Sequence, residues 1–257
     1  MRYTLLAICL LLVVSAVSWA ADPDLSIYYS FDNFAGVVPD DSGKGNDGTV
    51  VGDIVPDAGG KRAGAAKFTM GAFIDLDGAN FPAGDVPVDA MTLCAWANPE
   101  STGDNQAIFN ARASDETWIV HPELRGGGKV RWLLRSYGGT TIFNMEEGQW
   151  NPDQWIHFAG VYSAADNKAI LYLNGELISE IDTAGNVQIA ADWGLGARVG
   201  RNIDDARPFA GLMDDFCIFK RALSQDEIKS LMDVGPEVAA AVSSEGSITT
   251  TWGKIKN

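Results

Sequence analysis

The sequence predicts an all-β protein, a two-sheet antiparallel β-sandwich with one short C-terminal helix. Short apolar runs recur along the chain, and 28 glycines together with Asp, Asn and Pro separate them at short intervals. A tight turn at Asn174-Gly175 between two apolar runs is typical of a β-hairpin. The one segment that favours a helix follows Leu223 and is both capped and amphipathic.

Fourteen segments have the length and composition of β-strands. In chain order they are Leu25–Phe31, Gly48–Val51, Ala65–Thr69, Phe73–Leu76, Met91–Ala97, Ala107–Asn110, Trp118–His121, Lys129–Arg135, Thr141–Met145, Trp155–Tyr162, Ala169–Leu173, Glu176–Ile181, Arg198–Gly200 and Leu212–Phe219. No repeat period relates them, so an antiparallel sandwich is favoured over a repeat architecture.

The predicted helix has recognisable signals at both ends. Ser224 and Glu227 have the spacing of a capping box, in which each side chain bonds the other residue's backbone amide. An apolar stripe then follows at Ile228 and Leu231, and Gly235-Pro236 ends the helix.

The first twenty residues have the order of a secretory signal peptide. A basic residue, Arg2, precedes an apolar run from Leu5 to Val17, and the small-x-small pattern Ser18-Trp19-Ala20 follows. A retained membrane anchor is the alternative, but the run is shorter than the roughly 20 residues that a spanning helix needs. We therefore expect a secreted protein, extracellular or periplasmic, without a membrane span.

The expected organisation is a signal peptide over 1–20, a single domain over 21–235, and a flexible tail or an edge strand over 236–257. The formal net charge is −15, and removing Arg2 with the signal makes it about −16. Such an acidic chain repels nucleic acid and anionic membranes, which excludes nucleic acid as an expected partner.

Two cysteines are left after the signal, Cys94 and Cys217, and both lie in apolar strand-like runs. If their strands are neighbours, an oxidising compartment would allow a disulfide between them. Two buried free thiols that pack as small apolar groups are the alternative. The sequence leaves both alternatives open.

Three parts of the chain resemble the laminin-G-like, or concanavalin A-like, jelly-roll domains. They are Ser26–Asp32 with Asp40–Gly48, Trp155–Tyr162 with Ala169–Leu177, and Phe209–Ile228. The resemblance extends from about Leu25 to about Gly235. It implies a jelly roll that acts as a secreted binding module for carbohydrate or an extracellular protein and has no enzymatic activity.

The same resemblance implies a structural calcium ion where the opening loop meets the last strand. Suitable oxygen ligands in this sequence are Asp32, Asp41, Asn46, Asp214 and Asp215. Turns stabilised by Asp, Asn and Ser side chains without any ion are the alternative explanation of the opening loop.

An enzyme on the same scaffold, a glycan hydrolase or lyase, is the second functional hypothesis. Glu180-Ile-Asp182 begins a pattern that resembles the paired carboxylates of the related glucanases, but the third carboxylate position holds Gly185. A purely structural cell-surface component is the third hypothesis.

Candidate ligand-binding residues lie in the middle strands of the predicted sandwich. Trp118 and Trp132 could cover the apolar face of a sugar ring, and Arg131 and Arg135 could meet an acidic glycan or a protein carboxylate. Side-chain alternation places the two arginines on one face of their strand and Trp132 on the other.

Overall fold

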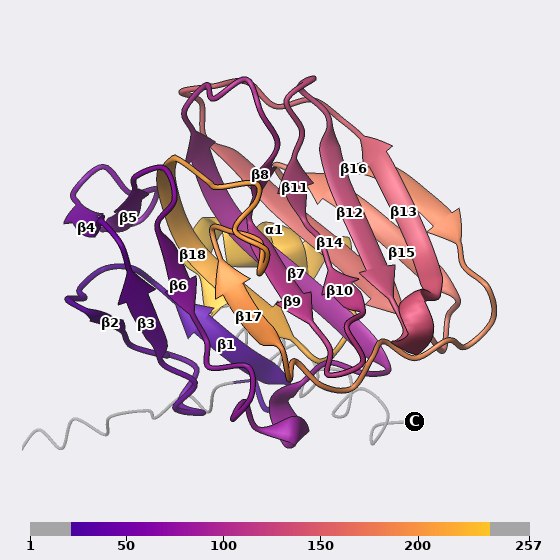
Figure 1. The fold of residues 1–257 in the computed structure, drawn as a ribbon. Helices are drawn as coiled ribbons and strands as arrows, with labels where there is room; N and C mark the ends of the chain where they lie inside the picture. Colours follow the sequence, from indigo (N-terminus) through magenta and orange to yellow (C-terminus); the bar gives the residue numbers. More distant parts are fainter. Residues whose placement is uncertain (1–21, 237–257) are drawn as a thin grey trace, which may run out of the picture.

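The computed structural model describes residues 22–236. Two antiparallel β-sheets lie face to face, and the helix α1 (Gln225–Val234) covers the outer face of one of them (Figure 1). This confirms the predicted two-sheet sandwich of the jelly-roll kind with one short helix near the end of the described chain. Two single turns of 3-10 helix, η1 (Ala83–Asp85) and η2 (Tyr137–Gly139), lie in connections between strands.

Sheet A is the sheet that α1 covers. Its strands, in spatial order, are β16 (Glu176–Asp182), β15 (Lys168–Leu173), β14 (Ile156–Ser163), β7 (Ala90–Pro99), β18 (Gly211–Phe219), β5 (Ala65–Phe68) and β4 (Ile54–Asp57), and β1 (Leu25–Tyr29) also pairs with β18.

Sheet B forms the other layer. Its strands, in spatial order, are β2 (Val37–Val38), β3 (Gly48–Val51), β6 (Phe73–Asp75), β17 (Gly196–Val199), β9 (Phe109–Arg112), β10 (Trp118–Val120), β12 (Val130–Arg135), β11 (Glu123–Leu124) and β8 (Gln106–Ala107), and β13 (Thr141–Glu147) also pairs with β12.

The hairpin of β15 and β16 has the turn that its sequence predicts. Asn174 and Gly175 both have positive φ, 52° and 76°, which is the geometry of a type I′ turn. The strands that the sequence did not predict are short or lie at an edge: β2 and β11 have two residues each, and β4 contains Pro56 at the edge of sheet A.

The apolar core lies between the two sheets, and Trp132 of β12 is buried in its centre. Its indole Nε1 donates to the carbonyl oxygen of Val161 on β14, at 3.3 Å, so the side chain bonds one sheet to the other. The ring also lies against Gly160 of β14. A Cβ atom at position 160 would lie only 2.7 Å from Trp132, so glycine is needed for this close approach.

The helix α1 is capped as predicted. The Ser224 hydroxyl accepts from the amide of Glu227, the Glu227 carboxylate accepts from the amide of Ser224, and Gly235 ends the helix. Ile228 and Leu231 are buried in a second apolar cluster, which lies between α1 and the outer face of sheet A. Because both faces of sheet A are covered, β14 is buried along its whole length.

Cys94 and Cys217 lie directly opposite each other on the neighbouring strands β7 and β18. Both are buried within the cluster under α1, and both are free thiols. Of the two alternatives that the sequence left open, the structure therefore has the one in which they pack as small apolar groups.

The two ends of the described chain meet beside α1. Strand β1 pairs with β18, and Asp22 forms an ion pair with Arg221 at 2.7 Å. Asp22 and Pro236 line the same small hollow, together with residues of the cluster under α1. The predicted signal peptide over 1–20 and the predicted tail after Pro236 lie outside the described residues. No helix within 22–236 is long and apolar enough to cross a membrane.

The contact between Gly160 and Trp132 leads to the first prediction. The substitution Gly160→Ala forces the added methyl group against the indole ring and should lower the free energy of unfolding by about 1–3 kcal/mol. The control is Gly127→Ala, because a Cβ atom at position 127 meets no atom within 4 Å and should change stability by less than about 0.5 kcal/mol. Urea unfolding followed by tryptophan fluorescence measures both, and equal stability of the two variants would contradict this account of the core.

Candidate functional site

Arginine side chains collect on the outward face of sheet B, although the sequence has a formal net charge of −15. They come from β9, β12 and β17 and from nearby loops, and all of them are partly exposed: Arg112, Arg125, Arg131, Arg135, Arg198, Arg201 and Arg207. We call this surface the arginine face. Of the arginines between residues 22 and 236, Arg62 and Arg221 alone lie elsewhere.

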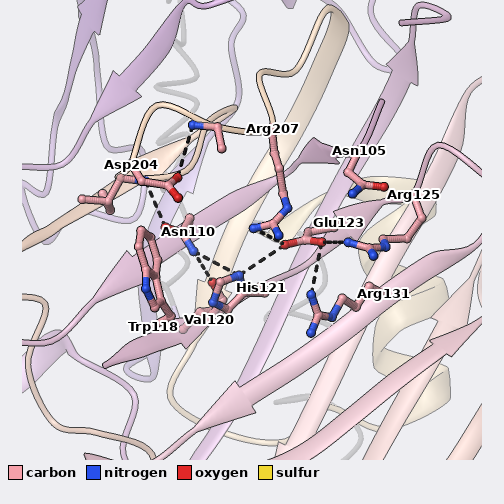
Figure 2. A network of polar contacts seen from close by, with 12 residues as sticks. Asn105, Asn110, Trp118, Val120, His121, Glu123, Arg125, Arg131, Asp204 and Arg207 are labelled. Atoms are coloured by element: carbon pink, nitrogen blue, oxygen red, sulfur yellow. Dashed lines mark hydrogen bonds and ion pairs between the residues drawn. The ribbon is translucent and has the colours of Figure 1, made fainter. Parts of the chain in front are cut away.

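Glu123 of β11 lies at the centre of the arginine face and is 0% exposed. Its Oε2 atom lies 2.8 Å from Arg125 Nη1 and 3.5 Å from Arg131 Nη1, and its Oε1 atom lies 3.4 Å from Arg207 Nη1. Figure 2 shows these three arginine side chains reaching Glu123 from different directions. One buried carboxylate therefore gathers three guanidinium groups.

His121 connects this cluster to the neighbouring part of the sheet. Its Nδ1 atom lies 3.2 Å from Glu123 Oε1, and its Nε2 atom lies 3.4 Å from Arg135 Nη1. Burial lowers the pKa of His121 although the hydrogen bond to Glu123 opposes this effect, so the ring is neutral at neutral pH. These partners assign the proton to Nδ1, which donates to Glu123, and leave Nε2 to accept from Arg135.

Glu123 stays ionised over the whole ordinary pH range. Burial alone would raise the pKa of its carboxyl group, but the hydrogen bond from His121 and the charges of Arg207 and Arg131 outweigh burial and lower the pKa to about 2. The carboxylate is therefore a fixed negative charge that holds the arginines, and it has no proton to donate at neutral pH.

Trp118 and Arg135 border an open hollow beside the cluster, which is also lined by Asp115, Glu116, Thr117, Gly138 and Gly139. The guanidinium carbon of Arg112 lies 4.6 Å from the centre of the Trp118 ring, and Arg135 Nη1 donates to the carbonyl oxygen of Trp118 at 3.0 Å. The hollow thus offers an aromatic ring, a guanidinium group and backbone polar groups to a ligand.

Among the predicted ligand-binding residues, the structure brings Trp118 and Arg135 together and places Arg131 beside them on β12. The inclusion of Trp132 was wrong. Trp132 is 0% exposed and packs between the sheets against Phe143 and Phe158, so its ring cannot stack on a ligand.

The five residues predicted to hold calcium have protein partners of their own. Asp41 accepts from Ser30, Asp32 accepts from the amide of Gly64, and the Asn46 side chain donates to Ser26 and Asp85.

The two aspartates of β18 are held in the same way. Asp214 accepts from the amides of Lys61 and Arg62, and Asp215 accepts from the Tyr28 hydroxyl and pairs with Arg62 at 2.9 Å. Nowhere in the described range do three or more Asp, Glu, His or Cys side chains form a group that could hold a metal ion. Asp214 Oδ1 is buried and has no hydrogen-bond partner within the described residues, and calcium binding stays a prediction.

The sequence reasoning missed Glu123, Arg125 and Arg207. Glu123 lies in a strand of only two residues, which gives no periodic pattern, and Arg207 lies in the loop that precedes β18. Glu123 lies opposite Arg131 across β11 and β12, an arrangement common for opposite charges, but this pairing is known from the structure and no local pattern in the sequence indicates it.

Comparison with known proteins gives one family match. The family model described as the concanavalin A-like lectin/glucanases superfamily matches residues 75–229. Pentraxin-related protein PTX3 of Mus musculus is 21% identical over 168 residues, which are 60% of this chain and 41% of that protein. The chain thus spans about two fifths of the length of the curated relatives it matches.

Two solved structures resemble this fold over most of the described chain. Domain 4 of AbnA, a GH43 extracellular arabinanase from Geobacillus stearothermophilus, in complex with arabinotriose, has a TM-score of 0.56 and 21% identity, with 81% of this chain and 98% of that chain covered. The binding domain of botulinum neurotoxin serotype G has a TM-score of 0.61 and 16% identity, with 82% and 51% covered. At these identities the likeness concerns the fold alone.

The charge of Glu123 leads to a prediction about acid unfolding. Because its pKa is lower in the folded state than the ordinary 4.5, Glu123 stabilises the fold above about pH 4.5 and loses this effect as the pH falls towards 2. The difference in unfolding free energy between wild type and Glu123→Gln should therefore shrink by about 3 kcal/mol from pH 5 to pH 2. Urea unfolding at a series of pH values measures it. The exposed Glu180→Gln variant is the control, and a Glu123→Gln difference that does not change with pH would contradict the assignment.

The metal prediction has a direct test in thermal unfolding. An ion that binds only the folded state raises the melting temperature. Because Asp214 Oδ1 is buried without a hydrogen-bond partner within the described residues, we expect a higher melting temperature in millimolar calcium than in EDTA. The same melting temperature in both would remove the metal prediction and leave the fold intact.

Proposed function

Because the chain belongs to the concanavalin A-like lectin/glucanases superfamily, we propose that it is a non-catalytic carbohydrate-binding protein. The proposed binding surface is the arginine face, and the sugar ring is proposed to lie in the hollow that Trp118 and Arg135 border. The observation that carries the proposal is this combination of a partly exposed indole and a guanidinium group beside an open hollow on a rigid sheet.

The chemistry of the hollow suits a sugar. An indole ring covers the apolar C–H face of a pyranose, while guanidinium and backbone groups bond its hydroxyl groups. The Trp118 ring is fixed by the Arg112 guanidinium that lies over it, and Arg135 is fixed by its bond to the Trp118 carbonyl group. A ligand would therefore meet groups that are already in position, which reduces the entropy cost of binding.

The similar structures support the same class of function. The AbnA domain is described in complex with arabinotriose, and the botulinum neurotoxin domain is described as a binding domain. They support the proposal because the same sandwich serves as a recognition unit in both.

The carboxylates favour binding over catalysis. Glycoside hydrolysis uses two carboxyl groups across the scissile bond, one of which must carry a proton. Glu180 and Asp182 both pair with Lys168, at 2.7 and 2.8 Å, on the exposed edge strand β16. Asp214, whose pKa burial raises to about 7, lies in sheet A, away from the arginine face. We therefore propose that the arginine face binds sugar without cleaving it.

Export is part of the proposed function. The N-terminal sequence predicts a signal peptide that ends at Ala20, which directs a protein out of the cytoplasm. We accordingly propose an extracellular or periplasmic location.

A glycan array with the full chain tests the proposal. We expect binding of at least one oligosaccharide by wild type, and the substitution Trp118→Ala should weaken that binding at least tenfold because the ring that covers the sugar is removed. The control Leu177→Ala removes an exposed apolar side chain from the edge of sheet A and should change nothing. Turnover of the glycan would instead favour the enzyme hypothesis, and the absence of any hit would favour a protein-binding or structural role.

A further inference from the structure

The ionised side chains around Glu123 carry more positive charge than negative charge. Four guanidinium groups, those of Arg125, Arg131, Arg135 and Arg207, lie around two carboxylates, Glu123 and Glu146. With His121 neutral, the local surplus is two positive charges. A carboxylate offsets the charge of one guanidinium group, so the surplus positive charge is available to pair with an anion.

The guanidinium groups also keep unused hydrogen-bond donors. Each guanidinium group has five N–H bonds. Of the three arginines that pair with Glu123, Arg125 alone lies at the distance of a strong charge-assisted hydrogen bond, 2.8 Å. Arg131 and Arg207 lie 3.5 and 3.4 Å from the carboxylate, and their side chains are 15% and 31% exposed. Their free N–H groups are therefore available to an anion that arrives from the solvent.

Two features hold these arginines in place. The Arg131 Nε atom donates to Asn144 Oδ1 at 2.8 Å, which fixes the plane of its guanidinium group. Arg207 has a φ of 53°, in the left-handed region that residues other than glycine rarely adopt. Among the described residues, Glu123 is the one whose side chain forms an ion pair with the Arg207 guanidinium. A strained backbone that aims a poorly satisfied side chain is typical of a binding site.

From this geometry we infer that Arg131, Arg207 and Arg125 bind the carboxylate of an acidic sugar residue above the buried Glu123. The inference rests on the proposed function and specifies its ligand class as a uronic acid oligosaccharide, with one ring near Trp118 and a carboxylate at the arginines. A planar carboxylate matches the fork of a guanidinium group and can accept two parallel hydrogen bonds from it. Glu123 then acts as a positioning residue, which holds the arginines without touching the ligand.

The net charge of the protein does not attract an acidic ligand, so the proposed preference for one depends on short-range contacts. A chain with a formal charge of −15 repels an acidic oligosaccharide at long range, so binding depends on contacts at the arginine face. Added salt screens both the long-range repulsion and the contacts at the arginine face, so the acidic and neutral ligands are compared at one fixed salt concentration.

The test compares uronic acid trisaccharides with the same trisaccharides after reduction of each carboxyl group to an alcohol, by isothermal titration calorimetry on the full chain. We expect the acidic form to bind at least tenfold more tightly than the reduced form. Arg207→Gln and Arg131→Gln should each abolish most of this preference, because they weaken binding of the acidic form more than binding of the reduced form. Lys168→Gln is the matched control, because it removes one positive charge from sheet A.

The possible results separate this inference from the proposed function. Equal binding of both forms, or a preference that survives in both arginine variants, would overturn the inference and leave the carbohydrate-binding proposal intact. Tighter binding of sulfated trisaccharides than of uronic acids would overturn the choice of a carboxylate. The absence of binding to any form would overturn both proposals. Arg207 lies in a partly exposed loop, so Arg207→Gln gives a folded variant even if Arg131→Gln does not fold, and circular dichroism verifies the fold of each.

Discussion

The alternation of side chains along β12 is the constraint on which both the core and the candidate site depend. Arg131 and Arg135 point to the solvent, whereas Trp132 between them points into the core. Pairing fixes this register on both sides, with Glu123 opposite Arg131 and Met145 opposite Trp132. A slip by one residue would place guanidinium groups in the core and the indole in water, so apolar burial holds the arginine face in place.

The sequence predicted the fold class because its strongest signals are local. The Asn174-Gly175 turn and the capping box of Ser224 with Glu227 involve residues only a few positions apart, and the structure has both. The two-residue strands β2 and β11 could not be predicted in this way, because their existence depends on partners distant in the sequence. The burial of both faces of β14 likewise depends on α1, which follows much later in the chain.

The candidate site was predictable in part for the same reason. Strand periodicity indicates that Arg131 and Arg135 share a face, and they do. The same periodicity places Trp132 on the opposite face, which in a sandwich means the core, and this argument should have excluded it as a ligand-binding residue. The contact of Arg207 with Glu123 joins a loop to a short strand that lies far from it in the sequence, and no local pattern could indicate it.

The pairing of β1 with β18 fixes where the two ends of the described chain lie. Asp22 and Pro236 meet beside α1, in the layer that sheet A forms, whereas the arginine face belongs to the opposite layer (Figure 1). The described chain therefore begins and ends on one side, and its charged surface faces the opposite side. A neighbour joined directly at Asp22 or Pro236 would approach the sandwich from the side away from the arginine face.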